Sequence, residues 1–187
     1  MLVIGIVIGI VVLLLLFVVV VYNGLVRARN QTKNAWAQID VQLKRRHDLI
    51  PNLVETVKGY AAHERGTFEA VTNARNLAQS AVGKGVGAQA KAEGELSGFL
   101  SKLLAVAENY PQLKANENFL ALQEELTSTE NKISFSRQFY NDSVLHYNNN
   151  IQMFPPNILA GMFGFKQGEF FQTEAPAERE VPKVSFS

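Results

Sequence analysis

Apolar side chains recur every three or four residues along most of the chain, which is the period of a helix that buries one face. Between residues 35 and 60 this pattern comprises Trp36, Ile39, Leu43, Ile50, Leu53, Val57 and Tyr60. The basic run Lys44 to His47 interrupts the pattern, and Asp48 and Pro51 follow it. An N-cap residue and a proline in the first turn are typical of a helix start. The pattern therefore predicts a helix from about Asn23 to Arg46 and a second from about Asp48.

Two further helices are predicted after the second one, which stops at the glycine-rich turn from Gly83 to Gly87. The third helix ends at Pro111, because proline disfavours helix at the residue before it. The fourth is capped by Asn116 and keeps a coiled-coil-like apolar seam as far as Phe154. Four amphipathic helices with short connections form an antiparallel bundle. The predicted fold class is all-α; in the alternative, Pro51 only kinks one long helix and leaves three long helices.

The first 21 residues are apolar without interruption. About 20 such residues, at roughly 1.5 Å each, cross the hydrocarbon core of a bilayer. No basic residue precedes the stretch and no small-residue cleavage site closes it, which favours an uncleaved transmembrane anchor over a signal peptide. Gly5 and Gly9 form a small-xxx-small pattern that lets two membrane helices approach closely. We therefore expect these glycines at a contact between copies of the chain.

Basic residues follow the span, at Arg27, Arg29 and Lys33, whereas none precedes it. The positive-inside rule then places the N-terminus outside and the helical domain in the cytoplasm, with a periplasmic domain as the alternative. The resulting domain organisation is an anchor over 1–22, a helical bundle domain over 23–154, an apolar segment over 155–165 and a mostly disordered tail over 166–187.

The apolar segment has a predicted location, because four antiparallel helices that start at the membrane alternate between leaving it and returning. The fourth helix then brings the segment back beside the bilayer. Exposed apolar patches mark membrane or protein contacts, so we expect the following residues at the membrane interface: Phe154, Ile158, Leu159, Met162, Phe163 and Phe165. In the alternative, the segment folds back and plugs the open end of the bundle.

Candidate catalytic chemistry is sparse. Cysteine is absent, which excludes disulfides, thiolate metal sites and cysteine nucleophiles. His63 and Glu64 begin like a zinc-protease motif, but Thr67 occupies the place of the second histidine. We expect no cofactor and no metal. The net charge of +1 and the small basic cluster also argue against a nucleic-acid partner.

Several polar residues are embedded in the apolar faces of the second and fourth predicted helices. They are Asp48, Asn52, Glu55, Glu130, Arg137 and Asn141. If the two faces meet, Arg137 pairs with Glu55 or Asp48 inside the bundle. Such an interhelical polar network fixes helix register more than it adds stability. The alternative use of this group is a membrane-tethered hydrolase or metal-dependent enzyme.

Three stretches resemble the LemA family of bacterial membrane-anchored proteins: residues 35–60, the run from Tyr110 to Asn116, and Phe154-Pro155-Pro156 leading to Gly164-Phe165. The resemblance implies a helical bundle domain at the inner (plasma) membrane. It also implies, by analogy, a role in membrane organisation, since a magnetosome-associated branch of the family takes part in forming a membrane compartment. Some members look like lipoproteins with the domain outside, but this chain lacks their cysteine.

The leading hypothesis is a non-enzymatic, single-pass scaffold that self-associates and organises membrane or partner proteins. Its expected partners are membrane lipid, further copies of the chain and other membrane proteins. Besides the enzyme named above, the alternative is an adaptor for a membrane protease or a sensor kinase.

Overall fold

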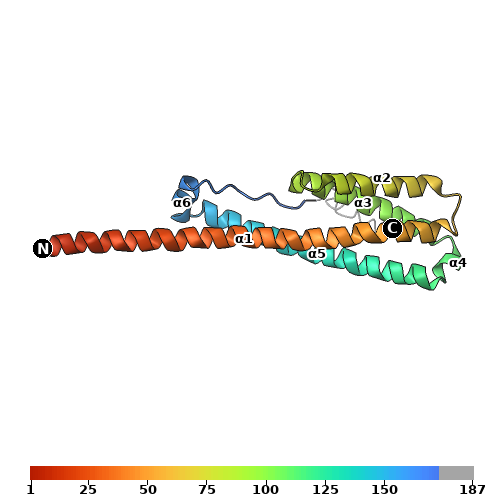
Figure 1. Cartoon of the computed structure of the whole chain (residues 1–187), viewed down its shortest axis with the longest axis horizontal. Coiled ribbons are helices and arrows are strands. Elements are labelled where there is room, and N and C mark those ends of the chain that lie inside the picture. The colour runs from red at the N-terminus through yellow and green to blue at the C-terminus, as the bar shows by residue number, and fades with distance from the viewer. Residues whose placement is uncertain (173–187) are drawn as a thin grey trace, which may run out of the picture. The chain divides into compact units, whose positions relative to one another are not determined.

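The computed structural model describes residues 1–172, and all of its regular elements are helices (Figure 1). Residues 173–187, the greater part of the predicted tail, lie outside the described residues. The elements are α1 (Leu2–Lys58), α2 (Arg65–Ala81), α3 (Val86–Ala107), α4 (Pro111–Lys114), α5 (Glu117–Gln152) and α6 (Pro156–Met162). No strand occurs in residues 1–172, so the predicted all-α fold class is confirmed.

Internal contacts divide the described chain into two compact units. The first unit contains residues 1–40 and 134–170, and the second contains residues 41–133 together with residues 171 and 172. Both long helices, α1 and α5, contribute to each unit.

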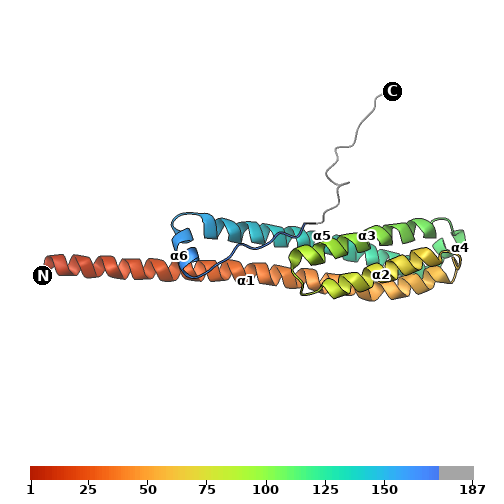
Figure 2. The same ribbon diagram turned by 90° about the horizontal axis from the view of Figure 1, so that it is seen from above.

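The second unit is the helical bundle, built from the last part of α1, from α2 and α3, and from the first part of α5, with α4 between α3 and α5. Figure 2 shows α2 and α3 lying side by side. One apolar core joins these helices and includes Leu53 and Val57 of α1, Val71 of α2, Leu100 of α3 and Leu126 of α5. Leu43, Ile50, Leu53 and Leu126 are each at most 3% exposed. These four positions of the predicted apolar faces therefore pack in the interior.

The predicted helix boundary at residues 46–48 is wrong, because α1 continues through this region and ends at Lys58. Pro51 lies inside the helix, as the three-helix alternative expected. That alternative fails on the number of helices, since the turn between Lys58 and Arg65 still separates α1 from α2. The bundle keeps four long helices, and its first turn comes about a dozen residues later than the sequence suggested.

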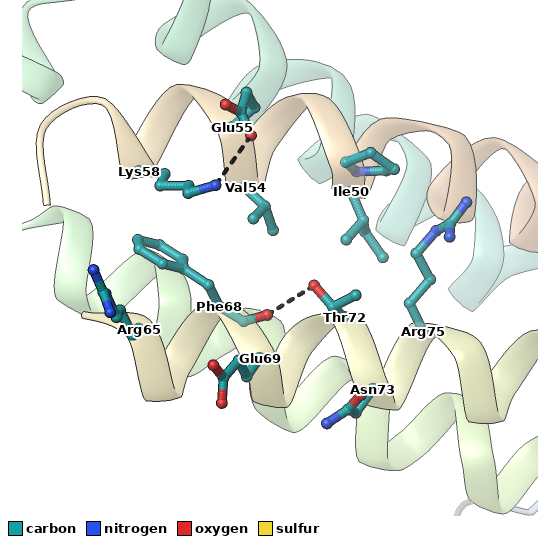
Figure 3. A pocket seen from close by; sticks show the side chains of 11 residues that line it. Ile50, Val54, Glu55, Lys58, Arg65, Phe68, Glu69, Thr72, Asn73 and Arg75 are labelled. Carbon is teal, nitrogen blue, oxygen red and sulfur yellow. Dashed lines mark hydrogen bonds and ion pairs between the residues drawn. The ribbon is translucent and has the colours of Figure 1, made fainter. Parts of the chain in front are cut away.

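A tertiary hydrogen bond explains how α1 tolerates Pro51. Proline has no backbone N–H, so the carbonyl four residues earlier, that of His47, loses its helical donor. The Nε of Arg75 on α2 donates to this carbonyl oxygen at 2.7 Å. In Figure 3, Arg75 extends from α2 towards α1 near Ile50. The neighbouring helix thus satisfies the acceptor that the proline leaves free.

The first unit pairs residues 22–40 of α1 with the last part of α5. Trp36 and Tyr140 stack edge to face, with ring centroids 5.2 Å apart. Farther along, Leu25 and Ala28 of α1 form a buried cluster with Tyr147 and Ile151 of α5 and Ala160 of α6. As residue numbers fall on α1 they rise on α5, so the two helices are antiparallel. This pairing brings α6 to the end of α1 that carries the apolar span.

The segment after α6 is held along α5, although residue 166 was predicted to begin a mostly disordered tail. Three side chains of α5 donate to its backbone carbonyls at 2.8–3.0 Å, namely Tyr147 to Lys166, Asn148 to Gly168 and Tyr140 to Glu169. The N–H of Gly168 donates back to the Asn148 side chain at 2.8 Å. Burial, followed by the charge of Glu169, raises the pKa of Tyr140.

We predict that Arg75→Met lowers the free energy of unfolding by about 1–3 kcal/mol, because it leaves the His47 carbonyl without a donor. In a Pro51→Ala background the restored backbone N–H donates to that carbonyl, so the same Arg75 substitution should cost much less. Chemical denaturation of the full chain in detergent measures both values. An equal cost in the two backgrounds would show that Arg75 acts through other contacts.

Candidate functional site

The first candidate site is the apolar end of the first unit, residues 153–165, which we call the α6 cap. The ring of Phe163 lies 4.9 Å from that of Tyr22, and the ring of Phe165 lies 5.9 Å from it. Val21 and Phe165 both pack on the buried cluster around Leu25. The α6 cap therefore contacts α1 where the apolar span ends.

The six residues predicted at the membrane interface divide into two groups. Phe154, Ile158, Met162 and Phe163 are 78%, 55%, 73% and 52% exposed. Leu159 is buried, and Phe165 is half-buried, with the Arg29 guanidinium 5.1 Å from its ring centroid. The α6 cap folds back with one face, as the alternative expected, and leaves its other face exposed. Contact of that face with lipid remains a prediction.

The second candidate site is an ion cluster in the second unit. The side chain of Arg46 on α1 is 2% exposed and pairs with Glu93 on α3, which is 3% exposed. Arg46 Nη1 also donates to Glu130 Oε1 on α5 at 2.9 Å and to Ser97 Oγ at 2.8 Å. His47 Nε2 lies 2.9 Å from the other oxygen of Glu93. Three helices therefore meet at one buried guanidinium.

Electrostatics keep this cluster charged. Burial alone raises the pKa of Glu93, but contact with the His47 ring and the charge of Arg46 outweigh it, so the pKa of Glu93 lies below its ordinary value. A carboxyl with a lowered pKa stays ionised at neutral pH and is a poor proton carrier. The cluster is therefore suited to holding helices together rather than to acid–base chemistry.

Of the six residues predicted to form an interhelical network, Glu130 contacts the buried ion cluster. Asp48, Asn52 and Glu55 are exposed, and Glu55 pairs with Lys58 on the surface at 3.8 Å. Because both carboxylates are exposed, the predicted pairing of Arg137 with Glu55 or Asp48 inside the bundle is wrong. Arg137 and Asn141 are half-buried on the part of α5 that belongs to the first unit.

Sequence reasoning missed Arg46, His47 and Glu93. Their spacing holds a usable signal, because Arg46 falls three residues after Leu43 and four before Ile50, on the same helix face. Glu93 stands three residues before Leu96 on the buried face of α3. A charged residue on an apolar helix face is buried where the helix continues past it. The first predicted helix ends at Arg46 because of Asp48 and Pro51, so this position was not recognised as interior.

An open groove of about 730 Å³ lies between α1 and α2 in the second unit. Figure 3 shows Ile50, Val54 and Phe68 directed into it. Among its charged lining residues, Lys58 pairs with Glu55 and Arg75 binds the His47 carbonyl, while Arg65 and Glu69 also line it. Across residues 1–172, no group of three or more His, Cys, Asp or Glu side chains is placed to hold a metal ion. The groove thus presents an amphipathic surface.

The sequence of this chain is similar to those of several known proteins. The model of the LemA family matches residues 35–186. Magnetosome proteins MamQ 1 and MamQ 2 of Paramagnetospirillum magneticum are each 29% identical over 180 residues, covering 83% of this chain and 66% of theirs. Protein LemA of Metamycoplasma hominis is 26% identical over 151 residues, covering 80% of this chain and 68% of that protein. The chain thus spans slightly less than two thirds of the length of the two MamQ proteins.

Removing one partner of the buried pair should be costly. We predict that Arg46→Met lowers the free energy of unfolding by about 3–5 kcal/mol, because Glu93 is left as an uncompensated buried charge. Arg45→Met is the matched control, since the neighbouring Arg45–Glu125 pair is solvent-exposed and is worth about 0.2–1 kcal/mol. The double variant Arg46→Met/Glu93→Met should recover much of the loss. Denaturation of the full chain in detergent measures each value, and similar costs for Arg45 and Arg46 would refute the assignment.

The lowered pKa of Glu93 also predicts a pH dependence. Its stabilisation is complete well above 4.5, the ordinary pKa, and is lost as the pH falls from there through the lower pKa of the folded state, because the unfolded chain takes up the proton first. Glu93→Gln should be less stable at neutral pH and lose less stability on acidification, whereas Glu125→Gln should follow the parent chain. Parallel curves for all three proteins would contradict this.

Proposed function

We propose that this chain, which belongs to the LemA family, is a non-enzymatic scaffold anchored in a membrane. It self-associates and organises membrane or partner proteins. Its N-terminus lies outside the inner (plasma) membrane and its bundle lies in the cytoplasm, since Arg27, Arg29 and Lys33 follow the span. By analogy with relatives named as magnetosome proteins, the organised structure is a membrane.

The observation that carries the proposal is the continuity of α1. Its first 20 residues form an exposed apolar stretch, long and apolar enough to cross a membrane. The same helix supplies Ile50, Leu53 and Val57 to the core of the bundle, with no break before Lys58. Because no loop separates the two parts, whatever binds the bundle is tied to the membrane by a continuous helix.

The use of charge in the bundle supports a structural role over an enzymatic one. Glu93 and Glu130 each pair with Arg46, and none of these three residues lines the groove between α1 and α2. An enzyme built on these carboxylates would need one with a raised pKa as its acid or base. Glu93 has the opposite shift.

Self-association is assigned to the membrane span. Gly5 and Gly9 lie one helical turn apart, and no other atom of the chain outside their own helix lies within 4 Å of a Cβ built at either position. The surface at Gly5 and Gly9 fits close packing against a second span, because the lack of a side chain lets the backbones of two membrane helices approach each other.

We predict that the full chain is oligomeric in detergent and that Gly5→Ile/Gly9→Ile weakens self-association roughly tenfold, equivalent to about 1.4 kcal/mol. Both substitutions keep the span apolar, so insertion should be unaffected. Val7→Ile/Val11→Ile is the matched control, with the same spacing on a different face of the helix. Sedimentation analysis gives the oligomer size. A monomeric parent chain would refute the scaffold, whereas an unchanged oligomer in the glycine variant would move the contact away from the span.

A further inference from the structure

We propose that the α6 cap is a second membrane contact, whose exposed side chains enter the lipid interface beside the anchor. The inference rests on the membrane anchor of the proposed function but not on self-association. With this contact the chain has two attachments to one bilayer, namely the spanning helix and the α6 cap, which lies in the plane of the interface.

The depth of the α6 cap follows from its contacts with α1. The apolar span ends at Val21, and the α6 cap contacts Tyr22 and the cluster around Leu25. These residues extend about 1.5–6 Å beyond the span, at 1.5 Å per residue. The polar interface of a bilayer is roughly 5–7 Å thick on each side of the hydrocarbon core. The contacts of the α6 cap with α1 thus lie at interfacial depth.

The exposed face of the α6 cap has the chemistry of this layer. Its large apolar side chains, each more than half exposed, are Met153, Phe154, Ile158, Met162 and Phe163. Residues 153–165 contain no charged side chain. Such a cluster is costly in water, at about 25 cal/mol for each Å² of apolar surface, and patches of this kind mark contact surfaces.

Charge at the edge of the α6 cap favours lipid as the occupant over a second copy of the chain. Arg29 is exposed and lies over the Phe165 ring, and Lys166 follows the α6 cap directly. Cations beside an apolar, aromatic surface match a boundary where phosphate headgroups meet acyl chains. Tyr22, in contact with Phe163, adds a further aromatic ring at the same level.

The natural absence of cysteine makes a direct test possible. Met162→Cys is labelled with an environment-sensitive fluorophore, and the full chain is reconstituted into vesicles of phosphatidylcholine and phosphatidylglycerol. Val12→Cys in the span is the lipid reference. Gln138→Cys, exposed on α5 of the same unit, is the aqueous reference. The label at 162 should show blue-shifted emission, quenching by nitroxide lipids and little quenching by iodide.

A paired substitution separates insertion from mere proximity to the anchor. Phe154→Glu places a charge on the exposed face of the α6 cap and should shift the label at 162 towards the aqueous reference. Phe135→Glu is the matched control, because Phe135 is 73% exposed on α5 outside the α6 cap, against 78% for Phe154. Circular dichroism and the fluorescence emission of Trp36 monitor folding in both variants.

Two results would overturn the inference. Iodide quenching at 162 equal to that at 138 would leave the α6 cap in water. Protection from both quenchers would mean that protein, including a second copy of the chain, covers it. A monomer whose label at 162 is quenched by lipid would instead refute self-association and leave this second contact standing.

Discussion

The burial of Arg46 is the constraint on which the bundle depends. A guanidinium that is 2% exposed is stable only where its partners stand in fixed positions, and here they come from α3 and α5. Sliding α3 by one residue would shift Glu93 by about 1.5 Å and turn it by about 100° around the helix, which would separate the pair. The same turn would carry Leu96 and Leu100 of α3 out of the core, so the apolar face and the ion cluster require the same register.

His47 and Pro51, which follow Arg46 on α1, also depend on contacts with neighbouring helices. His47 contacts Glu93 through its ring and binds Arg75 through its carbonyl, which Pro51 has left without a helical donor. A basic run and a proline, both unfavourable inside an isolated helix, thus become the place where α1 is tied to α2, α3 and α5. This also explains why α1 crosses the region unbroken, because the hydrogen bond from Arg75 replaces the helical one that Pro51 removes.

In the first unit the constraint is different, because the pair formed by α1 and α5 ends next to the apolar span and its buried cluster has to be covered there. The antiparallel pairing of α1 and α5 delivers α6 next to Tyr22, and Leu159 and Ala160 cover the end of the buried cluster. Asn148 and two tyrosines then hold the following segment along α5. Because α6 has only seven residues, it can bury only part of the apolar segment, and Phe154 and Met162 stay exposed.

The all-α class, the apolar span and the burial of Leu43, Ile50 and Leu53 could be predicted from the sequence, because they follow from the period and length of apolar runs. The choice between four and three long helices stayed open at that level. Local signals could not determine the end of α1, since Pro51 is a helix breaker only while the His47 carbonyl lacks a donor, and Arg75 comes from another helix. The polar pairing was likewise decided by tertiary structure. Asp48, Asn52 and Glu55 have helical spacing but face water, whereas Arg46 finds Glu93 at a distance of 47 residues along the chain. A charge is buried or solvated according to which helix faces it, and only packing supplies that partner.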